Sequence, residues 1–162
     1  MNQPIDQAAD AQAKGQQFGI QKIFTKDVSF ECPSAPQVFR KEWKPEVNVE
    51  LGNEASNIAN NTYEVVLTVT VTVKIPDMTA YLCEIKQAGI FYVEGFEQQP
   101  LDGLLGSYCP NILFPFAREV VADLVQRSGF PPFYLQPVNF DAIYAQQKQQ
   151  QGEDQPEPKT KH

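Results

Sequence analysis

The chain has 162 residues, of which 42% are hydrophobic and 11% aromatic, and its formal net charge at pH 7 is −7. This length suits one domain with a substantial core. The acidic balance argues against a nucleic-acid partner, because a negative surface repels the phosphate backbone. We also expect no insertion into membranes, because no stretch approaches the roughly 20 apolar residues of a membrane-spanning helix.

The rare residues argue against an enzyme. The one histidine is the last residue, His162, so a serine or cysteine nucleophile has no histidine in the folded part to activate it. The three cysteines, Cys32, Cys83 and Cys109, lack the C-x-x-C spacing of a structural zinc site, and no glycine-rich phosphate-binding motif is present. The sequence therefore predicts neither a metal nor a cofactor. A carboxylate pair assembled by the fold, or Cys109 itself, stays open as an enzymatic alternative.

Alternation between apolar and polar residues predicts strands in the first half of the chain. Over 20–31 the odd positions are largely polar, which places Asp27 and Glu31 on one solvent-facing side. A second strand is expected over 46–51, with its apolar side formed by Val47, Val49 and Leu51. The apolar side of the first strand is expected to hold Ile20, Phe24, Val28 and Phe30.

Two further strands, 63–75 and 78–93, are predicted to form a hairpin. The first is dense in β-branched residues, which disfavours a helix. The dipeptide Pro76-Asp77 between the two strands is typical of a turn.

The last of these strands carries two features that bear on function. Leu82 and Glu84 fall on one face, because strand side chains repeat every second residue. Gly89 interrupts the strand and indicates a bulge or the close approach of another backbone.

Helical spacing replaces alternation after Pro100 and continues to Arg127, with Pro110 and Pro115 limiting where a regular helix can begin. Two adjacent apolar rows cover more of this helix than the stripe of about 100° that one sheet needs. The helix is therefore either buried within its own domain or shared between the sheet and a neighbouring subunit. The rows are Ile112, Phe116, Val120 and Leu124, and Leu113, Ala117, Val121 and Val125.

Ser128-Gly129 is predicted to end this helix, and Asn139 to cap a short second helix. Four strands followed by two helices predict an α+β domain, an antiparallel sheet with both helices packed on one face. We expect that domain to span 18–145, between disordered polar tails at 1–17 and 146–162.

Four segments of the chain are distinctive. They are Cys109-Pro-Asn-Ile-Leu-Phe-Pro-Phe-Ala-Arg118, Thr25-Lys-Asp-Val-Ser-Phe-Glu31, Pro137-Val-Asn-Phe-Asp-Ala142 and Tyr63-Glu-Val-Val-Leu67. Together they resemble SecB, a family of bacterial protein-export chaperones. The resemblance extends over 18–144 and implies a homotetramer, a dimer of dimers in which the long helices lie between four-stranded sheets.

The resemblance implies an ATP-independent holdase in the bacterial cytoplasm. Such a chaperone keeps unfolded preproteins competent for translocation and delivers them to the translocation ATPase SecA. The zinc-bearing C-terminal segment of SecA is then expected to bind an acidic sheet surface formed by Asp27, Glu31, Leu82 and Glu84. The implied subunit interface contains Cys83, Ile85, Gln87, Phe116 and Val120.

The client site implied by the resemblance is a groove between the connections 32–45 and 129–137. Both connections are aromatic and contain several prolines, and stiff loops can hold apolar side chains partly exposed. The expected groove residues are Phe39, Trp43, Val49, Leu51, Phe133 and Leu135.

Plainer interpretations of both surfaces remain open. The aromatic residues could be ordinary core beneath long loops, and the acidic strand face could serve solubility alone. A functional alternative to the chaperone is an adaptor that binds SecA-like basic tails through the acidic face and has no client site.

Overall fold

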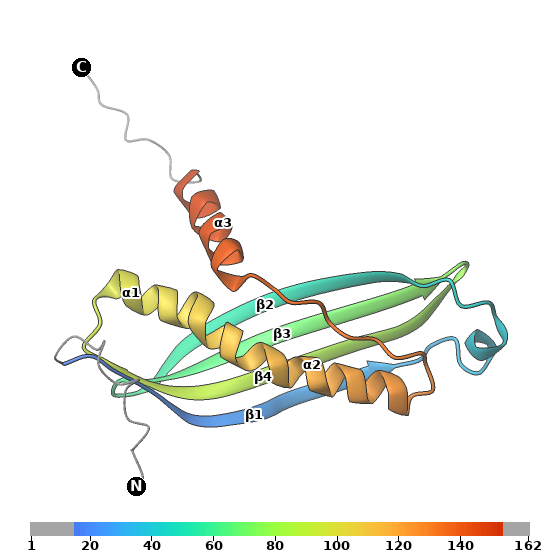
Figure 1. Cartoon of the computed structure of the whole chain (residues 1–162), viewed down its shortest axis with the longest axis horizontal. Helices are drawn as coiled ribbons and strands as arrows, with labels where there is room; N and C mark the ends of the chain where they lie inside the picture. Colours follow the sequence, from blue (N-terminus) through green and yellow to red (C-terminus); the bar gives the residue numbers. More distant parts are fainter. Residues whose placement is uncertain (1–14, 154–162) are drawn as a thin grey trace, which may run out of the picture.

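The computed structural model describes residues 15–153, which form a four-stranded antiparallel sheet with helices beside it (Figure 1). The sheet order is β1-β4-β3-β2, so β1 and β2 are the edge strands. The predicted fold class and the β3–β4 hairpin are confirmed, with Asp77 at a positive φ of 67° in the turn. The strands are β1 (Gln17–Glu31), β2 (Glu46–Ala59), β3 (Thr62–Ile75) and β4 (Met78–Glu94).

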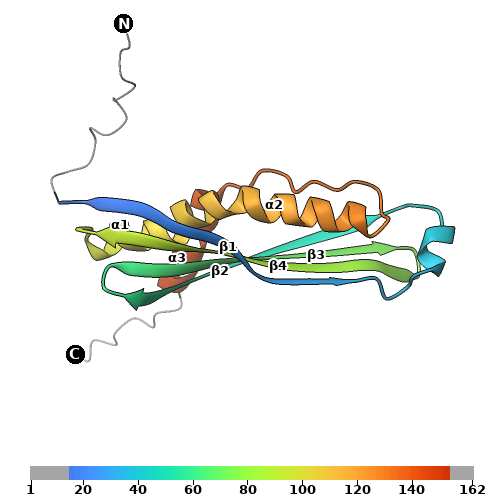
Figure 2. The same ribbon diagram turned by 90° about the horizontal axis from the view of Figure 1, so that it is seen from below.

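The long helix and the chain that follows it lie on the same side of the sheet. Figure 2 shows α2 and the connection after it stacked above one sheet face, which we call the inner face. The opposite side is the outer face. The helical elements are α1 (Gln98–Gly103), a π-helical turn (Leu104–Tyr108), α2 (Cys109–Arg127), α3 (Phe140–Glu153) and a short 3-10 turn after β1 (Gln37–Arg40).

The core lies between α2 and the inner face of β3 and β4. Every second residue of both strands is buried there, from Val65 to Val73 on β3 and from Tyr81 to Val93 on β4. The two apolar rows of α2 have different surroundings. The row Leu113, Ala117, Val121 and Val125 is fully buried against the sheet, whereas Phe116 in the other row is 43% exposed.

Strand β1 does not keep a single alternation, because it contains two one-residue bulges. Its register against β4 shifts between Ile20 and Lys22 and again between Thr25 and Asp27. Each extra residue reverses which side chains face inward. The expectation that Phe24 shares a face with Val28 is therefore wrong: Phe24 is on the outer face and Val28 on the inner one.

Strand β2 continues to Ala59, eight residues beyond the predicted end at Leu51. Apolar alternation stops at Asn53, whose Nδ2 donates to the carbonyl of Leu105 in the π-helical turn at 3.0 Å. A polar residue occupies this inner-face position because it bonds another element. The strand itself persists because its backbone pairs with β3.

Gly89 is neither a bulge nor a contact with another backbone. Its pairing with β1 and β3 is regular. A Cβ at this position would lie 2.7 Å from the ring of Phe91 and 3.1 Å from the Cδ2 of Leu113. The glycine therefore leaves space for side chains of β4 and α2.

The helical region begins earlier than predicted, α2 ends at Arg127 as predicted, and α3 continues further than predicted. It starts at Gln98 and passes both Pro110 and Pro115. The π-helical turn just before Pro110 already departs from the i→i−4 pattern that proline would interrupt. Helix α3 reaches Glu153, so 146–153 are helical and not a disordered tail, and β1 already begins at Gln17; the tail predictions for 1–14 and 154–162 fall outside the described residues.

Candidate functional site

The four residues predicted to form the acidic surface lie together on the outer face. Glu31 of β1 pairs directly with Leu82 of β4, and Glu84 pairs with Ser29 in the next outer-face row. Asp27 lies one row further along the same face. Asp27 and Glu31 are exposed, and Leu82 and Glu84 are half-buried. The bulge beside Asp27 ends before this residue, so Asp27 and Glu31 lie on one face, as the alternation predicts.

One acidic residue was missed by sequence reasoning. Glu50 of β2 pairs with Thr70 of β3, which in turn pairs with Glu84 of β4. Thr70 Oγ1 donates to Glu84 Oε2 at 3.3 Å and so orients this carboxylate. Acidic side chains on the outer face therefore extend from β1 to β2, although within this row the β3 position is Thr70 and the β1 position is Ser29. Alternation in 46–51 had placed Glu50 opposite the apolar side, but strand order was needed to bring it beside Glu84.

Lysines bound the acidic surface on one side. Lys86 of β4 pairs directly with Asp27, and both point to the outer face. The bulge residue Lys26 forms an ion pair with Glu64 of β3, with Nζ 2.8 Å from Oε1. Negative charge therefore concentrates around Glu31, Glu50 and Glu84, and it is partly neutralised beyond Asp27.

The two aromatic connections meet at Phe130, directly after α2 ends. Its ring centroid lies 5.0 Å from that of Phe39, 5.7 Å from Trp43 and 4.8 Å from Tyr81. Gly129 adopts φ +91°, and a Cβ there would lie 3.5 Å from the ring of Phe39. Phe130 itself is buried, whereas Phe39 is 50% exposed and Trp43 half-buried. Phe130 was within a predicted connection but was not recognised as its anchor.

Apolar surface continues along β2 from this aromatic cluster. Val47 and Val49 point to the inner face but are each 41% exposed, and Leu51 is half-buried, because α2 packs on β3 and β4. Phe133 is also half-buried. Leu135 is only 4% exposed and belongs to the core, so the expectation that it stays partly open is wrong.

The predicted interface residues fall into two groups. Cys83, Ile85 and Gln87 lie on the inner face of β4 and are buried within the chain itself, so the described subunit does not present them to a neighbour. These three residues share one face of β4, and α2 of the same chain covers that face. Phe116 and Val120 lie on the outward row of α2, and both remain at least partly accessible.

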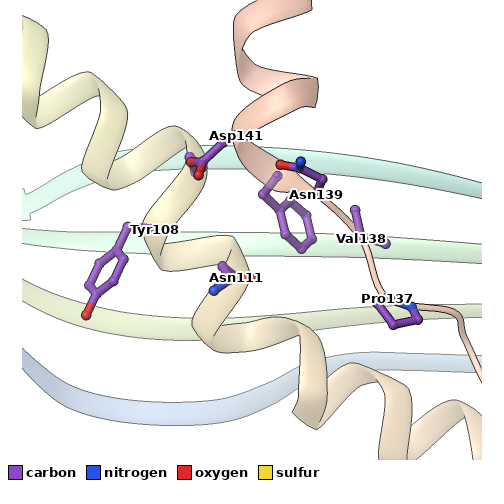
Figure 3. A pocket seen from close by; sticks show the side chains of 8 residues that line it. Tyr108, Asn111, Pro137, Val138, Asn139 and Asp141 are labelled. Atoms are coloured by element: carbon purple, nitrogen blue, oxygen red, sulfur yellow. The ribbon is translucent and has the colours of Figure 1, made fainter.

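A hollow separates the π-helical turn from the start of α3 (Figure 3). Figure 3 shows Asn111 on one side and Asn139 and Asp141 on the other. Ser107 Oγ donates to a carboxylate oxygen of Asp141, and Asn139 Oδ1 accepts from the backbone N–H of Ala142 at 3.0 Å. The predicted cap at Asn139 is confirmed. The Ser107–Asp141 hydrogen bond connects α3 to the π-helical turn.

The buried cysteines are poorly suited to nucleophilic chemistry. Burial raises the pKa of the Cys109 thiol to about 12 and that of Cys83 to about 11. Both thiols are therefore protonated at neutral pH, and the thiolate is the nucleophilic form. Within residues 15–153, no three histidine, cysteine or acidic side chains cluster as metal ligands do.

No helix within residues 15–153 is both long enough and apolar enough to cross a membrane.

Comparisons with known proteins agree on one family. The model of SecB, the preprotein translocase subunit, matches residues 11–151. The protein-export protein SecB of Nitrosococcus oceani is 58% identical over 90% of this chain and 90% of its own. That of Methylococcus capsulatus is 54% identical over 90% of this chain and 94% of its own.

A solved structure shares the fold at lower sequence similarity. The SecB-like chaperone of Mycobacterium tuberculosis matches with a TM-score of 0.61 and 17% identity, over 75% of this chain and 90% of that one. Taken with the sheet, the long helix and the sequence matches, this agreement identifies the chain as a member of the SecB family of protein-export chaperones, which are not enzymes.

Proposed function

We propose that this chain is a holdase of the bacterial cytoplasm: it binds unfolded preproteins, keeps them competent for translocation without ATP and delivers them to SecA. The observation that carries this proposal is the apolar surface left open on the inner face. Val47 and Val49 on β2 and Phe39 beside Phe130 all keep a large exposed fraction within one subunit. A monomeric domain with no partner normally avoids such contiguous apolar exposure.

The energetics favour long clients over short peptides. Burial of one client leucine or phenylalanine contributes about 1.5–3 kcal/mol, whereas ordering each backbone residue costs about 1–2 kcal/mol. A short peptide should therefore bind weakly. A client that reaches several grooves makes its later contacts intramolecularly, which raises avidity by about 10²–10⁴-fold.

Assembly supplies those several grooves in this proposal. The outward row of α2, with Phe116 and Val120, and the half-exposed Ile20 and Val28 on edge strand β1 are the surfaces that we assign to other subunits. Their burial in a homotetramer, a dimer of dimers, would remove Phe116, the large exposed apolar side chain of α2, from water. The groove residues on β2 lie at the opposite edge of the sheet and stay available.

The outer face is proposed to receive the zinc-bearing C-terminal segment of SecA. Asp27, Glu31 and Glu84 offer negative charge to a basic segment, and Leu82, which pairs with Glu31, offers an apolar contact. Each exposed ion pair contributes only about 0–1 kcal/mol and is screened by salt, so several must act together. Glu50 extends the same surface.

A chaperone of the same fold supports the client site. The Mycobacterium tuberculosis protein was solved in complex with a ChAD peptide from an antitoxin. Peptide binding by that chaperone is consistent with a groove that accepts unfolded segments here.

The holdase proposal is tested with an unfolded, slow-folding preprotein. Addition of the assembled protein at increasing ratios should delay aggregation and refolding, and nucleotide should have no effect. Light scattering and the recovery of native fluorescence measure the two delays. If no slow-folding client is delayed at any ratio, the protein is not a holdase.

The adaptor alternative is separated by titrating two ligands into the same protein. The zinc-loaded SecA segment and an unfolded client are added in turn in a calorimeter. The proposal requires both to bind, and an adaptor would bind the SecA segment alone. Sedimentation of the same samples reports the assembly state and its occupancy by the client.

A further inference from the structure

The acidic surface depends on a single extra residue in β1. Thr25 pairs with Gln87 of β4, and Asp27 pairs with Lys86, so β1 advances two residues where β4 advances one. The inserted residue is Lys26. Since strand side chains alternate, removal of this insertion would turn the following side chains to the other face. Asp27 and Glu31 would then point inward, away from Leu82 and Glu84.

Gln87 holds the strand at this point from the inner face. Its Oε1 accepts a hydrogen bond from Thr25 Oγ1 at 3.0 Å, and its Nε2 donates to the carbonyl of Phe24 at 3.1 Å. Both partners directly precede the inserted Lys26. The amide thus bonds the side chain and the backbone of the two residues that lead into the bulge.

This arrangement is unusual for its surroundings. Gln87 is only 2% exposed, and its inner-face neighbours along β4 are Ile85 and Gly89. A buried amide without partners would be costly, and an aliphatic residue of similar size would suit the core under α2 better. An amide at this position makes two hydrogen bonds to β1 that an aliphatic side chain could not make.

We propose that Gln87 is a positioning residue for the acidic surface: it holds the bulge at Lys26 and so keeps Asp27 and Glu31 on the outer face beside Glu84. The part of this inference that concerns binding rests on the proposed docking of a basic, zinc-bearing segment on that face. Gln87 does not touch the docked segment, because it lies on the opposite side of the sheet.

The binding experiment uses Gln87→Leu in the full-length assembled protein, with the zinc-loaded SecA segment and an unfolded client as probes. Loss of the bulge should weaken binding of the SecA segment at least tenfold, while client affinity stays within twofold. Gln126→Leu, which removes an exposed amide from α2, is the matched control and should change neither affinity.

A register measurement tests the same inference without any ligand. Cysteines placed at Asp27 and Lys86 in a Cys32→Ser background lie directly opposite and should cross-link on mild oxidation. Gln87→Leu should lower this yield at least threefold. A control pair at Lys22 and Ile90, on the other side of Lys26, should cross-link equally in both backgrounds.

Retention of the 27–86 cross-link in Gln87→Leu would overturn the assignment, and so would a lost cross-link with unchanged binding of the SecA segment. If wild type does not bind that segment, the proposed docking fails, and the two cross-links still decide whether Gln87 holds the bulge. Should Gln87→Leu not fold, Thr25→Val removes one of the two bonds from an exposed position. Thr25→Val should weaken binding of the SecA segment and lower the yield of the 27–86 cross-link, each by a smaller factor than Gln87→Leu.

Discussion

The two faces of this sheet are built from the same strands but have opposite chemistry. Along β2, Val49 faces inward to the open apolar surface, and the next residue, Glu50, faces outward to the acidic row. Along β4, Cys83 is core and Glu84 belongs to the acidic surface. A period of two therefore lets one sheet offer two unlike surfaces without overlap. Substitution of adjacent residues should separate them.

The two faces should also respond differently to solution conditions. Interactions between exposed charges are screened beyond about 8 Å at physiological salt, and they weaken further as the salt concentration rises. Apolar burial has no such dependence on moderate salt. Rising salt should therefore release a basic ligand from the outer face before it releases a client from the groove.

The largest expected effect is on stability, from the anchor of the inner face. Phe130→Ala removes the ring on which Phe39, Trp43 and Tyr81 converge, and we expect the free energy of unfolding to fall by about 3–5 kcal/mol. Denaturant unfolding at a fixed protomer concentration measures this change. Phe39→Ala, at a half-exposed position, should destabilise much less and mainly weaken client binding. If the two variants lower the free energy of unfolding equally, Phe130 is not the anchor of this cluster.

Reversal of one outer-face charge should have the next largest effect. Glu84→Lys places a cation beside Glu31, Glu50 and Thr70, and we expect binding of the SecA segment at low salt to weaken about 10- to 100-fold. Client affinity should not change. Glu97→Lys, an exposed site before α1, is the control for the altered net charge. If Glu84→Lys lowers the affinities for the SecA segment and for the client equally, the two faces are not independent.

A sharper comparison uses the neighbours Val49 and Glu50. Val49→Ala removes apolar contact from a partly exposed site and should weaken client binding about threefold, with binding of the SecA segment unchanged. Glu50→Gln should do the reverse, with about a two- to threefold loss for the SecA segment alone. Paired calorimetric titrations measure both. The separation fails if either variant affects the other ligand to the same degree.

The smallest effect concerns pH. Burial raises the pKa of Cys109 to about 12, above the value of about 8.5 for a free thiol. A raised pKa means that the protonated thiol is favoured by folding, so its contribution is complete below pH 8.5 and declines as pH rises toward 12. The free energy of unfolding should therefore fall less steeply between pH 8 and 10 for Cys109→Ala than for wild type. If the free energy of unfolding has the same pH dependence in both proteins, burial does not raise the pKa of this thiol.

Much of the fold was predictable because its signals are local. Alternation identified the β3–β4 hairpin, and the turn at Pro76-Asp77 needs only neighbouring residues. The two rows of α2 followed from helical spacing, although only packing showed which row meets the sheet. The unpredicted part of β2 and the passage of the helix through Pro110 depend on contacts with other elements.

The candidate surfaces were predictable to different degrees. The four acidic-surface residues could be grouped by strand period and by resemblance, whereas Glu50 and the bounding Lys86 required the order of the strands. In the groove, Leu135 was assigned as open but is buried, because exposure depends on which residues the connection covers.

The sequence by itself determined which residues alternate, where strands turn and which helix carries two apolar rows, because each of these depends on backbone preferences within a few residues. Only the tertiary structure decided which face of β1 each side chain occupies. That choice depends on two one-residue bulges, which only the pairing of β1 with β4 reveals. At the second bulge Thr25 donates a hydrogen bond to Gln87, 62 positions away in the chain.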